Sequence, residues 1–101
     1  MSTFAQLLTA VLTEPGPQLD RTDVEGLTVS TVHTTDMGCE TALLDAKSAH
    51  PVERYGEDRE AALEGHAKWV AWARDRTHTT VTKLGYGDLI PPVTITLQRG
   101  V

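Results

Sequence analysis

Cysteine, aromatic residues and clustered positive charge are all scarce in this chain. Cys39 is the single cysteine among 101 residues, so no internal disulfide can form and the fold does not depend on an oxidising compartment. Aromatic residues make up 5% of the chain, so each one matters more than usual to the core or to an interface. They are Phe4, Tyr55, Trp69, Trp72 and Tyr86.

The charge balance argues against two classes of partner. The net charge is −5 and the nine basic residues are scattered without a basic run, whereas phosphate neutralisation needs clustered Lys and Arg. We therefore expect no direct nucleic-acid partner, and the same sign disfavours an anionic membrane surface. No segment approaches the 18 apolar residues of a membrane span. The apolar stretch 4–12 has no basic region before it, so we expect no secretory signal peptide.

Residues 1–14 are predicted to form an amphipathic helix, or arm. Its apolar residues follow the spacing i, i+3, i+4, i+7 and i+8, which makes one stripe on a helix: Phe4, Leu7, Leu8, Val11 and Leu12. A helix this short is marginal alone in water, so the stripe must dock on something. Two hypotheses stay open: the arm folds back on its own domain, or it docks on a neighbouring subunit across the polar connector 15–26.

Residues 27–101 are predicted to form one small α+β domain. Strands are expected at 27–34, 39–44, 50–55, 79–84 and 93–98, with one long helix at 58–76. This order predicts a mainly antiparallel sheet with the helix packed across one face. We expect the following residues to be mostly buried: Val29, Leu43, Ala62, Trp69, Val70 and Ile95.

The helix carries two features that periodicity alone does not explain. Trp72 lies on the flank of the core face, where it either covers the core edge or anchors a protein interface, in which Trp is enriched. Gly65 in mid-helix costs about 1 kcal/mol relative to Ala, so a group approaching closely is expected, either Trp72 or a neighbour's strand. Glu64 and Lys68 are expected to form an i, i+4 pair.

Titratable residues do not form a recognisable catalytic or metal motif. The histidines, at 33, 50, 66 and 78, lack the close ligand pairs of a zinc site. A site assembled from Cys39, His50 and His66 across the sheet is a less favoured alternative to a core His66 that hydrogen-bonds a strand.

Two carboxylates raise a separate alternative. One alternative pairs Glu40 with Glu53 across a hairpin for acid–base chemistry, but we favour a position for both on a solvent face near Arg54 or Lys47. We therefore expect no catalysis, no metal and no cofactor.

A recurring pattern runs through the middle of the chain: Met37–Ala42, Val52–Tyr55, Glu60-Ala61 and Gly65-His66 followed by Trp69-Val70. Over residues 37 to about 86 it resembles short uncharacterised proteins of tailed phages and prophages, especially those of actinobacteria. The resemblance identifies no active site. It implies a phage or prophage origin and a place in the virion.

The expected function is accordingly a non-catalytic structural or assembly protein of the capsid, connector or tail. Its expected partners are copies of itself or other virion proteins, reached through an interface made by the residues Phe4, Leu7, Leu8, Val11, Leu12 and Trp72. The alternative is a small acidic protein in the cytoplasm of the infected host that binds and inhibits a host protein, steered by its negative charge.

Overall fold

The computed structural model describes residues 18–100. The predicted N-terminal helix and its stripe (Phe4, Leu7, Leu8, Val11 and Leu12) lie outside the described residues. The described elements follow the order β1 (Gln18–Val24), β2 (Leu27–Thr34), β3 (Gly38–Leu44), β4 (Ala49–Gly56), α2 (Arg59–Arg74), β5 (Thr80–Lys83) and β6 (Val93–Thr96). Among the described residues, no helix has the length and apolar character needed to cross a membrane.

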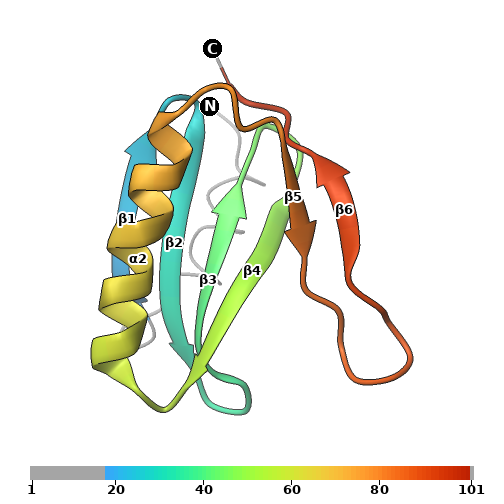
Figure 1. Cartoon of the computed structure of the whole chain (residues 1–101). Coiled ribbons are helices and arrows are strands. Elements are labelled where there is room, and N and C mark those ends of the chain that lie inside the picture. Colours follow the sequence, from blue (N-terminus) through green and yellow to red (C-terminus); the bar gives the residue numbers. More distant parts are fainter. Residues whose placement is uncertain (1–17, 101) are drawn as a thin grey trace, which may run out of the picture.

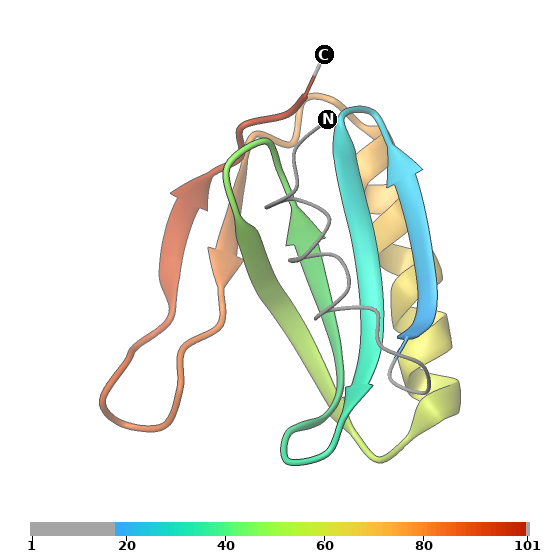
Figure 2. The same cartoon turned by 180° about the vertical axis from the view of Figure 1, so that it is seen from behind.

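The predicted α+β fold is confirmed. Strands β1 to β4 form a four-stranded antiparallel sheet in sequence order, and α2 lies across one face of it (Figure 1). Seen from behind, the sheet stands in front of the helix (Figure 2). Successive strands are joined by short turns and pair with each other. In each strand, every second side chain therefore points to the face that α2 covers.

Residues 18–24, predicted as part of a connector, instead form the edge strand β1. Its partner β2 follows after the two-residue turn Glu25-Gly26, and both turn residues have positive φ, 49° and 79°. That is the backbone twist that closes a tight hairpin. The sequence of β1 is polar because its outward side chains, such as Arg21 and Asp23, are exposed. Thr22, between them, faces the helix.

The core lies between α2 and the sheet. Val29 and Leu43 are directly opposed across β2 and β3 and are fully buried, with Val70 and Ala73 of the helix in the same cluster. The helix begins as predicted, because the Asp58 carboxylate accepts the Ala61 N–H at 2.9 Å and caps the first turn. Of the residues expected to be mostly buried, Val29, Leu43, Ala62 and Val70 are, whereas Trp69 and Ile95 are only partly buried.

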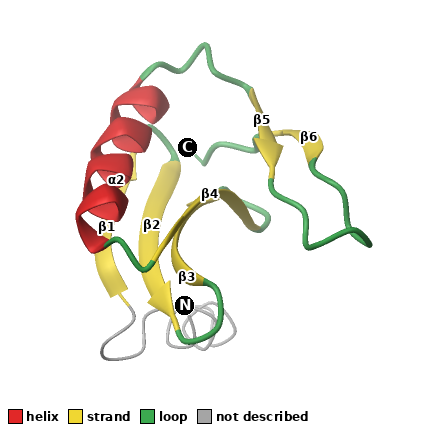
Figure 3. Ribbon diagram, turned by 60° about the horizontal axis from the view of Figure 1, so that its bottom comes forward, coloured by secondary structure: helices red, strands yellow, loops and turns green. Residues whose placement is uncertain are grey.

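Strands β5 and β6 form a separate two-stranded sheet, which stands beside the helix–sheet layers (Figure 3). It touches the edge strand β4 through one backbone hydrogen bond, from Leu84 N–H to the Pro51 carbonyl at 2.8 Å. Pro51 has no N–H to return, as expected for a proline on an edge strand.

Arg99 ties the end of the chain to three other segments. Its guanidinium donates to four backbone carbonyls at 2.9–3.1 Å, those of Glu25, Ala73, Asp75 and His78. These belong to the β1–β2 turn, the end of α2 and the segment leading to β5. One side chain therefore satisfies carbonyls that the end of the helix leaves without an intrahelical partner.

Candidate functional site

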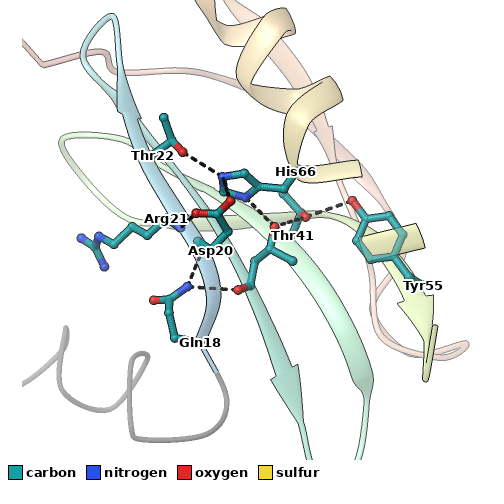
Figure 4. A network of polar contacts seen from close by, with 8 residues as sticks. Gln18, Asp20, Arg21, Thr22, Thr41, Tyr55 and His66 are labelled. Atoms are coloured by element: carbon teal, nitrogen blue, oxygen red, sulfur yellow. Dashed lines mark hydrogen bonds and ion pairs between the residues drawn. The ribbon is translucent and has the colours of Figure 1, made fainter. Parts of the chain in front are cut away.

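A chain of hydrogen-bonded side chains crosses the interface between α2 and the sheet (Figure 4). His66, 3% exposed, contacts the Thr22 hydroxyl through Nε2 at 2.9 Å and the Thr31 hydroxyl through Nδ1 at 2.8 Å. Thr31 contacts Thr41 at 2.6 Å, and the Tyr55 hydroxyl donates to Thr41 at 2.9 Å. The predicted role of His66, a core histidine that hydrogen-bonds a strand, is therefore confirmed.

Two arrangements of protons satisfy this whole chain with a neutral His66, one running from Tyr55 to His66 and one in the reverse direction, and the first agrees with the Tyr55-to-Thr41 hydrogen bond. In the first, Tyr55 donates to Thr41, Thr41 donates to Thr31, and Thr31 donates to Nδ1 of a neutral His66. The Nε2–H is then left to donate to Thr22, with the Asp20 carboxylate 3.7 Å away. Burial lowers the pKa of His66, although the Asp20 charge opposes the shift. At neutral pH the imidazole is thus uncharged and is shielded from any ligand.

Glu53 gathers three donors at the other end of this chain. Its Oε1 accepts from Lys68 Nζ at 2.6 Å and from the Trp69 indole N–H at 2.9 Å. It also lies 3.1 Å from the Tyr55 hydroxyl, which shares its single proton between Glu53 and Thr41. The prediction that Glu53 lies near Arg54 or Lys47 was wrong, because the strand register turns it to the helix face. For the same reason Lys68 pairs with Glu53 rather than with Glu64.

A shallow hollow opens beside Glu53 and is lined by Glu53, Tyr55, Ala61, Glu64, Gly65 and Lys68. Burial alone would raise the pKa of Glu53, but the hydrogen bonds from Lys68, Trp69 and Tyr55 outweigh it and lower that pKa. Burial and the neighbouring Glu53 raise the pKa of Tyr55 to about 12. Neither group titrates near neutrality, which is where a general acid or base works best.

The Tyr55 ring explains why position 65 is a glycine. A methyl group at position 65 would overlap the phenol ring, which packs directly on the helix backbone there. The close approach was predicted, but the group that makes it is neither Trp72 nor a neighbour's strand. It is the side chain of β4 that also belongs to the hydrogen-bonded chain, so the glycine lets the phenol reach Thr41.

Glu40 and Glu53 do not form a carboxylate pair. In the β3–β4 register, Glu40 is opposite Arg54 and Thr41 is opposite Glu53, so the two carboxylates lie on opposite faces of the sheet. Glu40 instead accepts from Arg54 Nε at 2.9 Å, as expected from the sequence.

The structure does not bring Cys39, His50 and His66 together. Cys39 is buried, His50 contacts Asp45 at 3.1 Å, and His66 lies in the chain described above. Within residues 18–100, no group of three His, Cys, Asp or Glu side chains is placed to hold a metal ion. The alternative of a metal site built from these three residues was therefore wrong.

Trp72 is half-buried at the edge of the core. Its ring stacks on His78 with centroids 4.4 Å apart and meets Trp69 edge-on at 5.3 Å. It also lines a groove between α2 and the β5–β6 hairpin, together with Val52, Trp69, Val81, Leu84 and Thr94 among others. Trp72 thus covers the core edge, and its part in an interface stays a prediction.

Exposed apolar side chains gather at the tip of the β5–β6 hairpin and at the first residue of β6, a region for which no interface was predicted from the sequence. Among the described residues, four of the six large apolar side chains that are exposed lie here: Tyr86, Leu89, Ile90 and Val93. Leu89 is 94% exposed. Figure 1 shows this loop extending beyond the rest of the domain.

The tip is held in one shape despite its exposure. Tyr86 and Ile90 exchange two backbone hydrogen bonds, at 2.7 and 3.2 Å. Arg54 donates to the Gly85 carbonyl at 3.1 Å, and its guanidinium lies 4.8 Å from the centre of the Tyr86 ring. The signal available in the sequence was the apolar pair Leu89-Ile90 between turn residues, at a place where a solvent-facing loop is normally polar.

Comparison with protein-family models, with curated proteins and with solved structures gives no match. The function proposed below therefore draws on the geometry of the chain and on the sequence pattern described above.

Proposed function

We propose that this chain is a non-catalytic protein-binding component that acts in assembly. The observation that carries the proposal is the hairpin tip, where Leu89, Ile90 and Val93 are 94%, 55% and 53% exposed. Exposed apolar side chains that gather in one region of a small domain are typical of protein contact sites. Because the tip is already ordered by backbone hydrogen bonds, little conformational entropy is lost when it binds.

The titratable groups support the same proposal. Glu53 is saturated by three donors, Tyr55 stays protonated, and His66 is buried and neutral. Each of these side chains holds the helix on the sheet. None of the three is an unoccupied acid or base with a pKa near neutrality, which acid–base catalysis requires.

Within this class we propose a virion component, with copies of itself or other virion proteins as partners. This step rests on the resemblance of residues 37–86 to tailed-phage and prophage proteins. The alternative, an inhibitor of a host protein in the infected cell, needs no incorporation into particles. Mass spectrometry of purified particles separates the two, because absence of the chain from particles contradicts a structural role.

The tip itself is tested by the paired substitutions Leu89→Ser and Ile90→Thr, made together. Both side chains are mostly exposed, so the fold should persist while the apolar contact is removed. We expect the number of copies per particle to fall at least about tenfold, a loss equivalent to about 1.4 kcal/mol of binding. The matched control is Leu63→Ser, at an exposed leucine on α2. Unchanged incorporation of the tip variant would contradict the role of the tip.

A further inference from the structure

Within residues 18–100, the outer edge of β6 carries backbone groups that have no hydrogen-bond partner. Among the described residues, β6 pairs with β5 alone. Leu97 N–H donates to the Thr79 carbonyl at 2.8 Å, and hydrogen-bonded positions alternate in an antiparallel ladder. Val93 and Ile95 therefore also direct their backbone groups toward β5, whereas Thr94 and Thr96 direct theirs outward.

This free edge has defined limits. At one end Pro92 has no N–H to offer. At the other end Gln98 is already occupied, because its N–H donates to Asp45 Oδ2 at 2.9 Å and its carbonyl accepts from Ala46 N–H at 2.8 Å. The edge therefore offers two donors and two acceptors, from Thr94 and Thr96. A partner strand must match that short, bounded pattern.

The edge is short, at four residues, but it lacks other features by which natural edge strands avoid pairing. Lysine, proline and bulges are the usual safeguards, whereas residues 93–97 read Val-Thr-Ile-Thr-Leu with no charge. The β5–β6 register runs without a shift. A two-stranded ribbon is marginal in water, and further strands stabilise it. An open, uncharged edge of this kind fits a strand of the same chemistry.

We propose that two copies of this chain pair antiparallel through β6, giving a four-stranded sheet from two hairpins. This inference rests on the proposed function and names a second copy as the partner at the hairpin. With Ile95 on the two-fold axis, Thr94 of each copy exchanges both backbone hydrogen bonds with Thr96 of the other, which makes four bonds. If Thr94 lay on the axis, Thr96 would be opposite Pro92 of the other copy, which has no N–H. If Thr96 lay on the axis, Thr94 would be opposite Gln98, whose backbone groups are already occupied.

The centred register predicts a specific response to charge. Substituting both Thr94→Lys and Thr96→Lys places like charges directly opposite each other at both cross-copy positions. Like charges directly opposite on a sheet are destabilising, so we expect the dimer dissociation constant to rise about tenfold or more. The combination Thr94→Glu with Thr96→Lys places opposite charges at the same positions, and we expect it to restore dimer formation.

The control is the same charge on the inner strand. Thr82 is opposite Thr94 in the hairpin and is likewise exposed, but it does not lie on the free edge, so Thr82→Lys should leave the dissociation constant within about twofold of wild type, as is usual for surface substitutions. Sedimentation equilibrium of the full chain measures these constants, and circular dichroism confirms that each variant is folded.

A second measurement needs no variant. In the wild-type protein, amide hydrogen exchange of Thr94 and Thr96 should slow as the protein concentration rises, whereas that of Leu97, which already donates to Thr79, should not change. A protein that stays monomeric up to millimolar concentration, or a dimer unaffected by the two lysines, would overturn this inference. Either result leaves the proposed function to be judged separately, by the incorporation of the tip variant into particles.

Discussion

Replacing Gly65 with Ala sets two known effects against each other in this structure. An alanine in the middle of a helix is favoured over glycine by about 1 kcal/mol. Against this, the new methyl group would overlap the Tyr55 ring, and forcing extra volume into a packed site costs about 1–3 kcal/mol. Moving the ring away would also break the Tyr55–Thr41 hydrogen bond of 2.9 Å, which is worth about 1 kcal/mol.

The second effect should win, so we expect Gly65→Ala to lower the free energy of unfolding by about 1–3 kcal/mol. Once the ring is removed by Tyr55→Ala, the same substitution should raise the free energy of unfolding by about 1 kcal/mol. The double-mutant cycle therefore predicts a coupling energy of about 2–4 kcal/mol between the two positions.

Urea unfolding followed by Trp69 and Trp72 fluorescence measures each corner of the cycle. The propensity term is calibrated by Ala67→Gly at an exposed position of the same helix, which should cost about 1 kcal/mol. If Gly65→Ala stabilises the wild type as much as it stabilises the Tyr55→Ala protein, the ring yields freely and the packing argument fails.

Two further predictions concern the side chains that fasten the end of the chain. Burial alone would raise the pKa of Asp45, but backbone N–H groups and His50 outweigh it and bring that pKa to about 2. Because a lowered carboxyl pKa stabilises the fold above its unfolded value of 3.8, about 2 kcal/mol should be lost as the pH falls from about 5 to 2. Asp45→Asn should remove that pH dependence in unfolding experiments. If the pH dependence persists in the variant, other titratable groups must cause it. Arg99→Ala should cost about 2–3 kcal/mol at pH 7 by the same assay, with Arg99→Lys recovering only part because an ammonium lacks the guanidinium fork; full recovery by lysine would contradict the four-carbonyl geometry.

The sequence was sufficient for the features that local chemistry determines. Asp58 before an apolar stripe at helical spacing predicted where α2 begins and which face it buries, because capping and amphipathicity act within a few residues. The β2–β3 and β3–β4 hairpins were predicted for the same reason, since their turns and alternation are local.

The misses have physical causes that span the fold. Strand β1 was taken for a connector because an edge strand buries few side chains, so its composition resembles a loop; the clue was Glu25-Gly26, a turn with positive φ at both residues. The contacts of Glu53 with α2 and the contacts of Arg99 could not be read from the sequence, because they join residues 15 to 74 positions apart. Such contacts depend on register and packing, which the sequence pattern does not encode directly.

In two places the domain departs from the usual rule that apolar side chains are buried and polar side chains are exposed. Thr31, Thr41 and His66 are buried under α2, which is tolerated because each polar atom has a partner. Leu89 and Ile90 are exposed, and exposed apolar side chains of this kind are typical of protein contact sites. Polar side chains at those two positions would suit the loop equally well. The hydrogen-bonded interior explains how the domain holds its shape, and the apolar tip beside an open strand edge explains why we look for its function in contacts with other protein surfaces.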